Sequence, residues 1–171
     1  MIVLIEPYEK YLKSYIEAYE EYQNNLVTTY AFDDAKSYDI FEKYHNYRNE
    51  INLKPGRVGS HYFWLVDDES DYFIGEITIR HQLNDALLQY GGHIGYGIRY
   101  SEWNKGYGSL MLSYALEKAK EIGLSKILIT CDDENIGSAK VMENNGFILQ
   151  DKVVNIINSK EIITRRYWKD L

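Results

Sequence analysis

The segment from residue 91 to residue 112 constrains the fold of this chain more than any other part of its sequence. Residues 93–99 alternate between isoleucine or tyrosine and smaller or polar side chains, which is the period-2 pattern of a β-strand. Gly106 and Gly108 follow, and from residue 110 onward apolar residues recur every three or four positions, as in an amphipathic helix. The segment therefore predicts a strand, a glycine-bearing turn and a helix.

A turn of this kind can bind a phosphate or pyrophosphate. The first amides of a helix have no acceptor within it, and the helix dipole is positive there. Gly106 and Gly108 would allow an anion to approach the backbone, and Lys105 adds a positive charge. The turn matches neither a P-loop nor a dinucleotide fingerprint, because the Gly-Lys-Ser/Thr and the third glycine are missing. Taken alone, the glycine pair is equally compatible with a tight turn that binds nothing.

The longer string at residues 94–108 is more specific; it reads Ile-Gly-Tyr-Gly-Ile-Arg-Tyr-Ser-Glu-Trp-Asn-Lys-Gly-Tyr-Gly. It resembles the coenzyme-A-binding segment of the GCN5-related N-acetyltransferases (GNAT), whose usual pattern is Arg/Gln-x-x-Gly-x-Gly/Ala. Trp103 takes the Arg/Gln position, which narrows the resemblance to the ribosomal-protein N-terminal acetyltransferase-like branch. The resemblance implies acetyl-CoA as the acetyl donor and a pyrophosphate held mainly by backbone amides. The implied cofactor-binding residues here are Ile98, Arg99, Tyr100, Trp103, Asn104, Lys105, Gly106, Tyr107, Gly108 and Ser109.

A second motif lies about thirty residues further along the chain. Residues 135–147 resemble the GNAT segment Asn-x-x-Ser-x-(Arg/Lys)-x-x-Glu-x-x-Gly-Phe in register. The resemblance implies that Asn135 contacts the pantetheine amides and that Ser138 bonds the cofactor or its sulfur, with Met142 completing the cofactor-binding set. Helix capping for Asn135 and a surface hydroxyl for Ser138 are the structural alternatives. Many family members place a tyrosine acid where this chain has Met142.

The resemblance and the hydrophobic periodicity together predict the fold. We expect an α/β (α+β) chain with a single GNAT-like domain over residues 1–171: a mixed, mostly antiparallel, twisted sheet of about seven strands, splayed at its centre, and about four helices. Strands are expected at 2–5, 61–66, 72–80, 91–99, 126–131, 153–157 and 161–168, and helices at 8–24, 37–49, 105–122 and 135–146. A short helical turn is possible within 81–90. Tyrosines between residues 8 and 22 follow one helical stripe, which favours an aromatic core face or a partner surface.

Acyl transfer from a thioester to an amine needs a neutral nitrogen, a donor for the oxyanion and a proton for the thiolate. The resemblance implies that the strand at 91–99 diverges from the strand at 126–131 and leaves a gap for pantetheine. A backbone amide near Tyr96 to Ile98 would then serve the oxyanion, and Gly95 and Gly97 would permit a bulge.

Four residues are catalytic candidates: Ser138 as a proton donor, and Glu76, His93 and Asp132 as bases. His93 has a suitable ordinary pKa, although a structural hydrogen bond explains it equally well. Asp132 is equally compatible with a solvated loop acid, and a water chain with no essential base is a further alternative. We expect no metal site, because these residues lack ligand spacing.

Composition limits the function classes. The net charge is −7 and no long basic run occurs, so we expect no nucleic-acid partner. The acidic field would favour a cationic acceptor such as an amine. No apolar run approaches the ~20 residues that span a bilayer, and the N-terminus does not resemble a signal peptide. A single cysteine, Cys131, excludes a disulfide framework, and we expect a cytoplasmic protein without a membrane partner.

The leading hypothesis is an acetyl-CoA-dependent N-acetyltransferase. It would move the acetyl group to a primary amine, either a small-molecule amine or a peptide N-terminus, by direct attack in a ternary complex, as a monomer or homodimer. The alternative is a non-catalytic acyl-CoA-binding regulatory module of the same fold. A phosphate-binding protein unrelated to coenzyme A is a third reading, which the second motif disfavours. The acceptor depends on residues 24–58 and 81–90, where no motif is found.

Overall fold

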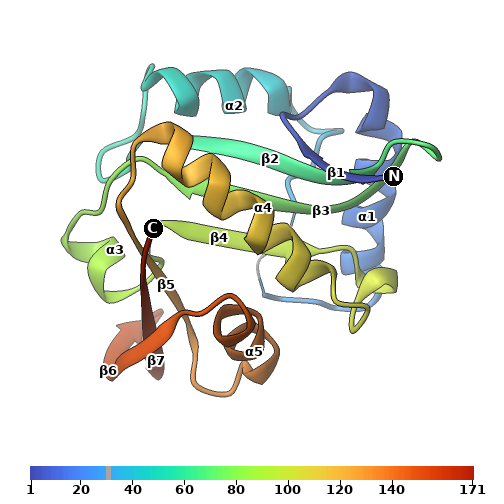
Figure 1. Cartoon of the computed structure of the whole chain (residues 1–171). Helices are drawn as coiled ribbons and strands as arrows, with labels where there is room; N and C mark the ends of the chain where they lie inside the picture. The colour runs from blue at the N-terminus through green and yellow to red at the C-terminus, as the bar shows by residue number, and fades with distance from the viewer. Residues whose placement is uncertain (30–31) are drawn as a thin grey trace.

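The computed structural model describes residues 1–29 and 32–171, and these contain seven β-strands and five α-helices (Figure 1). The strands are β1 (Ile2–Ile5), β2 (Ser60–Asp67), β3 (Tyr72–Arg80), β4 (Ile94–Ile98), β5 (Lys126–Asp132), β6 (Ile148–Ile157) and β7 (Lys160–Asp170). The helices are α1 (Leu12–Asn24), α2 (Ile40–Asn49), α3 (Asp85–Gln89), α4 (Tyr107–Ile122) and α5 (Ile136–Asn144), with short 3-10 helices η1 (Glu9–Tyr11) and η2 (Tyr100–Glu102). Residues 30 and 31, part of the segment expected to shape the acceptor site, lie outside the described residues.

The seven strands divide into two antiparallel sheets. One has the order β1-β2-β3-β4 and the other the order β5-β7-β6. The two meet where the amide of His93 donates to the carbonyl oxygen of Leu128 over 2.8 Å, just before β4 begins. The predicted fold class is confirmed, and the expected central splay is the place where one sheet ends and the other starts.

Local signals in the sequence explain where the helices begin and end. The side chain of Asp39 caps α2, because it accepts hydrogen bonds from the amides of Phe41 and Glu42 over 2.9 and 3.3 Å. Gly123 ends α4 in the left-handed conformation, with φ of 98°, which costs glycine nothing. Strands β6 and β7 run longer than predicted. Their antiparallel pairing continues through alternating polar residues, beyond the apolar stretches on which the prediction was based.

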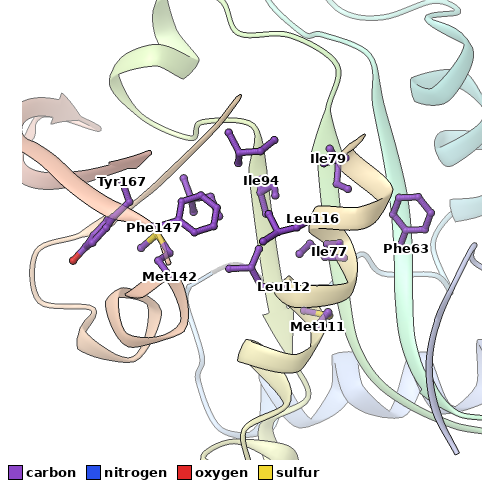
Figure 2. Packing of buried hydrophobic residues seen from close by; sticks show 14 of the residues in the cluster. Phe63, Ile77, Ile79, Ile94, Met111, Leu112, Leu116, Met142, Phe147 and Tyr167 are labelled. Atoms are coloured by element: carbon purple, nitrogen blue, oxygen red, sulfur yellow. The ribbon is translucent and has the colours of Figure 1, made fainter. Parts of the chain in front are cut away.

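Helix α4 covers one face of the four-stranded sheet and also reaches the second sheet (Figures 1 and 2). Its Leu112 and Leu116 point into a core that includes Ile77 and Ile94 of the first sheet and Tyr167 of the second. All of these side chains are buried. One continuous hydrophobic core thus joins the two sheets and holds the splay between them in place.

The opposite face of the four-stranded sheet carries an aromatic core under α1 and α2. Tyr15 stacks on Trp64 with ring centroids 4.8 Å apart, and Phe73 meets Tyr15 edge-on at 5.0 Å. Tyr22 and Tyr44 belong to the same cluster. Tyr11, Tyr15 and Tyr22 of the predicted tyrosine stripe are therefore core residues, whereas Tyr8 lies before the helix and is exposed.

Candidate active site

Strand β4 directs peptide groups toward β5 without forming a ladder with it. The amide of Arg80 donates to His93 O and the amide of Arg99 donates to Ile74 O, each over 2.7 Å. Since peptide groups of an antiparallel pair point alternately toward and away from the partner, those of Tyr96 and Ile98 point away from β3. Among the described residues, β5 pairs only with β7. We call the unpaired region between β4 and β5 beyond His93 the β4–β5 gap.

The pairing of β3 with β4 sets which residues face each side. It is regular from Ile79↔Ile94 to Gly75↔Ile98, so Gly95 and Gly97 do not produce the bulge that they would permit. Tyr96 faces the α4 side and packs against that core. Gly95 and Gly97 face the α1–α2 side, where they lie opposite Thr78 and Glu76. The backbone of β4 therefore carries no side chains on the α1–α2 side at these two positions.

The turn before α4 has the features of an anion site. Gly106 is the N-cap of this 16-residue helix, with φ of 85°, and within the described residues no side chain caps the helix there. The first-turn amides of Tyr107, Gly108 and Ser109 consequently have no intrahelical acceptor. A Cβ built on Gly106 meets no atom within 4 Å, so space is open beside these amides. The turn fits the pyrophosphate that the sequence implied.

Gly108 has a different reason to be glycine. A Cβ at Gly108 would lie 3.0 Å from Val141 Cγ2, so this residue allows α4 to pack closely against α5. Ser109 strengthens the same contact, because its carbonyl oxygen accepts from Asn145 Nδ2 over 3.1 Å and its hydroxyl from Asn144 Nδ2 over 3.2 Å. Of the two predicted glycines, Gly106 belongs to the turn and Gly108 to the helix interface.

The two residues before Gly106 have different roles. Asn104 adopts the left-handed conformation with φ of 61°, which asparagine tolerates better than most residues. Lys105 is exposed, and its Nζ lies 3.0 Å from Glu102 Oε2. An anion at the turn would compete with Glu102 for this ammonium group, so Lys105 contributes less to the local positive potential than a free lysine would.

The end of β4 is fastened by two aromatic donors. Ile98 O accepts from Trp103 Nε1 over 2.8 Å and from the Tyr22 hydroxyl over 2.5 Å. Burial raises the pKa of Tyr22 to about 12, so its hydroxyl remains a donor. The exposed ring of Tyr100 lies 4.9 Å from the Trp103 ring. The Trp103 side chain thus links the turn to the end of β4. An Arg or Gln side chain at this position would make different hydrogen bonds.

The side chain of Arg99 points away from the β4–β5 gap and ties β4 to α1. Its Nε donates to Glu21 over 2.7 Å and its NH1 donates to Ser14 Oγ over 3.0 Å, while its guanidinium lies 4.3 Å from the Tyr72 ring centroid. Burial opposes charge on Glu21, but hydrogen bonds from Ser101 and Arg99 prevail and lower its pKa. Any contact of Arg99 with a cofactor would therefore come from its main chain.

Tyr96 and Ser138 meet across the β4–β5 gap. Their hydroxyl oxygens lie 2.7 Å apart, and Ser138 also interacts with Cys131 on β5. Burial raises the pKa of Tyr96 above its ordinary value, and burial raises the pKa of Cys131 to about 11. The sequence analysis missed this use of Tyr96, although its place in the alternation of β4 showed that it shares a face with Ile94 and Ile98.

The other two residues of the second motif have structural positions. Asn135 caps α5 by accepting the amide of Ser138 over 3.0 Å, which is the alternative considered from the sequence. Met142 is fully buried in the core beneath α5 (Figure 2). The structure therefore places Met142 among core side chains, and it is Ser138 whose hydroxyl lies within hydrogen-bond distance of the Tyr96 phenol.

His93 fastens the two sheets together. Its Nδ1 accepts the amide of Leu128 over 2.9 Å, while its own amide donates to Leu128 O. Burial first, and the charge of Arg80 second, lower its pKa to about 4. Because its imidazole is neutral and its Nδ1 already accepts a hydrogen bond, His93 fits the structural role that the sequence left open.

Glu76 and Asp132 lie in contrasting environments. Glu76 is buried on the α1–α2 side opposite Gly97, and its Oε2 accepts from Tyr44 OH over 2.6 Å and from Trp64 Nε1 over 2.9 Å. Asp132 is exposed at the end of β5, where its carbonyl oxygen accepts the amide of Asn135. Glu76 therefore lies on the side where the β4 backbone is bare, opposite Gly97.

A cavity of about 240 Å³ opens on the same side of the sheet, between α2, α3 and strands β2 and β3. We call it the α2 cavity. Thr78, which lines it, is the direct neighbour of Gly95 in the β3–β4 pairing. The other polar and charged residues that line it include Asp33, Lys43, Arg57, Ser60 and Arg80. The cavity and the β4–β5 gap thus approach β4 from different sides.

Residues 1–29 and 32–171 contain no group of three or more His, Cys, Asp or Glu side chains that could hold a metal ion. None of their helices is long and apolar enough to cross a bilayer.

Comparisons with known proteins place these features in a family. The chain resembles the microcin C7 self-immunity acetyltransferase MccE, solved with acetyl-CoA and AMP, at 16% identity and a TM-score of 0.73, over 99% of this chain and 92% of that one. It resembles RimL, a ribosomal L7/L12 α-N-protein acetyltransferase solved with coenzyme A, at 13% identity and a TM-score of 0.72, over 99% and 94%. It also resembles the ribosomal-protein-S5-alanine acetyltransferase from Vibrio fischeri, at 17% identity and a TM-score of 0.69, over 99% and 91%.

No significant match was found among curated proteins. At these identities the solved structures establish the fold, while the family is established from the sequence. The family model for the acetyltransferase (GNAT) domain matches residues 4–148, most of the chain and both motifs. The chain therefore belongs to the GNAT acetyltransferase family.

Proposed function

We propose that this protein transfers the acetyl group of acetyl-CoA to the primary amine of an acceptor, by direct attack within a ternary complex. Acetyl-CoA is the acetyl donor that membership of the family assigns to the chain. The observation that carries the proposal is the continuity between the Tyr96 and Ile98 peptide groups in the β4–β5 gap and the uncapped first turn of α4. Together these groups would offer backbone donors to the pantetheine arm and to the pyrophosphate of one cofactor.

Different residues along β4 and α4 would bind different parts of the cofactor. The first-turn amides of Tyr107, Gly108 and Ser109 would hold the pyrophosphate, and the edge of β4 would hold the pantetheine amides as a neighbouring strand would. Bound acetyl-CoA supplies the reactive thioester. A gap-facing amide of Tyr96 or Ile98 would donate to the oxygen on which negative charge develops.

The proton for the departing sulfur would come from Tyr96, with Ser138 as its hydrogen-bond partner. The phenol stays protonated at neutral pH, because burial raises its pKa. The 2.7 Å separation of the two hydroxyl oxygens holds it in the β4–β5 gap. A phenol on β4 would thus replace the phenol that many family members carry at the position of Met142.

The acceptor amine would lose its proton on the α1–α2 side of the sheet. Glu76 would attract the amine and stabilise positive charge as the bond to the acetyl carbon forms, because it is a buried carboxylate opposite Gly97. His93 is excluded from this role in the proposal, since its Nδ1 already accepts the Leu128 amide. Water leading into the α2 cavity would accept the proton.

We also propose that the chain is one domain, acts as a monomer or homodimer and works in the cytoplasm. The core shared by α4 and both sheets supports the single domain. The solved neighbours named above act on ribosomal proteins or confer self-immunity, so they do not narrow the acceptor beyond a small-molecule amine or a peptide N-terminus.

Two measurements test the proposal. Calorimetric titration with acetyl-CoA, coenzyme A and ATP should show binding of the first two in preference to ATP. Thiol release across a panel of amines and free-N-terminal peptides should then identify turnover. Binding without turnover across the whole panel would favour the non-catalytic alternative, whereas absence of coenzyme A binding at millimolar concentration would contradict both.

A further inference from the structure

The carboxylate of Glu76 accepts hydrogen bonds from two different elements. Its Oε2 accepts from the Tyr44 hydroxyl of α2 over 2.6 Å and from Trp64 Nε1 of β2 over 2.9 Å. Trp64 is the direct neighbour of Glu76 in the β2–β3 pairing, so its indole reaches the carboxylate from within the sheet. Tyr44 reaches it from the helix that covers this face of the sheet. Two donors that approach one oxygen from a helix and a strand fix the position of that oxygen.

Tyr44 remains a hydrogen-bond donor in the folded protein. Burial first, and the charge of Glu76 second, raise the pKa of the Tyr44 phenol well above its ordinary value, so the phenol keeps its proton at neutral pH. A hydroxyl that donates to a carboxylate forms a stronger bond than one that donates to a neutral oxygen. The 2.6 Å separation of the two oxygens is typical of such a charge-assisted bond.

The ring of Tyr44 is held in place by its aromatic neighbours. It stacks on Tyr62 with ring centroids 4.4 Å apart, and it meets Phe41 and Trp64 edge-on, each at 6.2 Å. The Tyr44 side chain is itself buried. Because these rings contact Tyr44 on several sides, its phenol cannot swing away from Glu76 unless the aromatic core repacks.

Helix α2 also forms one wall of the α2 cavity. Lys43 precedes Tyr44 in the sequence and Tyr47 follows it by one helical turn, and both line the cavity. A displacement of α2 would therefore move Tyr44 together with the cavity wall. The position of Glu76 is in this way coupled to the helix that bounds the cavity.

We infer that Tyr44 is a positioning residue, whose hydroxyl holds the carboxylate of Glu76 where it meets the acceptor amine. The inference rests on the proposed function, in which Glu76 stabilises positive charge as the amine attacks. Tyr44 does not touch the amine in this arrangement, and it acts only through the orientation of Glu76. A displaced carboxylate stabilises the transition state less well, because that stabilisation depends on geometry. A hydroxyl that merely satisfied a buried carboxylate would affect stability and leave kcat unchanged.

Tyr44→Phe removes the hydroxyl and keeps the ring. The test uses the amine that wild type acetylates fastest among ethylamine, 2-phenylethylamine and the peptide trialanine. We expect kcat and kcat/KM to fall together by roughly tenfold, because the lost interaction acts in the transition state. The KM for the amine and the affinity for coenzyme A should stay within about twofold of wild type.

Tyr167→Phe is the matched control for the loss of a buried tyrosine hydroxyl. Tyr167 is buried, and its hydroxyl donates to Glu143 Oε1 over 2.9 Å, in the core beside the second sheet. This variant loses the same kind of hydrogen bond, so urea unfolding should show reduced stability. Its kcat should remain that of wild type, since Glu143 has no part in the proposed reaction.

A double-mutant cycle tests whether Tyr44 acts through Glu76. Glu76→Gln keeps the shape of the side chain and removes its charge, so adding Tyr44→Phe to it should not lower kcat further. Additive losses would show that Tyr44 acts independently and would overturn the inference. Glu76→Asp leaves Tyr44 intact and withdraws the carboxylate from its hydroxyl by one methylene group, so kcat should fall here too. Wild-type kcat in Glu76→Asp would overturn the inference even if Tyr44→Phe did not fold.

Failure of this inference can be told from failure of the proposed function. Wild-type kcat in folded Tyr44→Phe would overturn the inference and leave the acetyltransferase proposal standing. Wild-type kcat in Glu76→Gln would have the same consequence, because the reaction would then need no carboxylate at this position. Absence of coenzyme A binding, or of turnover with all of these amines in the wild-type protein, would remove the proposed function, and the inference with it.

Discussion

Tyr96 shows how one side chain acquires a role from its position between two elements. It lies on a strand beside the first motif, yet its hydroxyl reaches Ser138 of the second motif. Its phenol is protonated because burial raises its pKa, and it is fixed because Ser138 belongs to the first turn of α5. At the scale of the residue, the proposed mechanism assigns proton donation to this pair and not to Met142.

We predict that Tyr96→Phe lowers kcat by about 10²-fold, in line with the usual contribution of a positioned acid. Coenzyme A binding should change little, because the backbone amides of β4 remain. Thiol release and calorimetry on the same sample separate the two effects. Tyr114→Phe, on the exposed side of α4, is the matched control and should behave as wild type. An unchanged kcat in Tyr96→Phe would refute the assignment.

His93 makes the stability of the protein depend on pH. Its pKa is lowered to about 4 in the folded chain, against an ordinary value near 6.5. Between these values the unfolded chain binds a proton that the folded chain does not, so the free energy of unfolding falls as the pH drops through this window.

We therefore predict that wild type loses roughly 3 kcal/mol more stability than His93→Asn between pH 7 and pH 4. The asparagine oxygen can still accept the Leu128 amide but does not titrate. Urea unfolding at several pH values measures the difference, and both proteins carry the same carboxylates, which cancel in the comparison. Parallel pH profiles for the two proteins would show that His93 is not the titrating group.

At the scale of the element, α4 has a glycine at each end. Both have left-handed backbones, but only Gly106 lies beside the first-turn amides of the helix. Gly106 and Gly123 have φ of 85° and 98°, and a Cβ on either meets nothing within 4 Å. Alanine at either position should therefore cost a similar amount of stability, about 1 kcal/mol, from the left-handed conformation alone.

Only Gly106→Ala should weaken coenzyme A binding, by tenfold or more, because its methyl group would occupy the open space beside the first-turn amides. Gly123→Ala provides the control for strain, at the far end of the same helix. Titration of both folded variants with coenzyme A decides the matter. Equal affinities would mean that the turn only connects β4 to α4 and binds no pyrophosphate.

At the scale of the whole molecule, Arg99 joins the two cores. It leaves the end of β4, passes over Tyr72 and binds Ser14 and Glu21 of α1. Its side chain is 7% exposed, whereas Arg48 in its pair with Glu6 is 47% exposed. We therefore expect the ion pair of Arg99 with Glu21 to contribute more to the stability of the protein than the pair of Arg48 with Glu6.

We predict that Arg99→Met destabilises the protein by roughly 3 kcal/mol, because the carboxylate of Glu21 loses its main partner in a partly buried site. Arg48→Met should cost less than about 1 kcal/mol, since exposed pairs contribute little. Urea unfolding of the two variants gives both values. A similar, small loss in both would show that Arg99 does not hold α1 against the sheet.

Features that depend on neighbours within a few residues were determined by the sequence itself. The strand–turn–helix at residues 91–122 was expected from periodicity, and the structure has β4 at Ile94–Ile98 and α4 at Tyr107–Ile122. The Asp39 cap and the Gly123 stop depend likewise on local hydrogen bonds and backbone preferences. The two motifs also sufficed to assign the family. Local conformational preferences and motif spacing are enough for these features, since no distant contact is needed to produce them.

Only the tertiary structure decided which distant groups meet. It brought Tyr96 to Ser138, buried Arg99 against α1, used His93 to fasten Leu128 and gathered Lys43, Arg57, Arg80 and Asp33 around one cavity. These outcomes depend on how α1, α4 and the two sheets pack, because packing decides which face of each strand is covered and which charges share a cavity. A period-2 pattern assigns a residue to a face, but the partner it finds there is set by the fold.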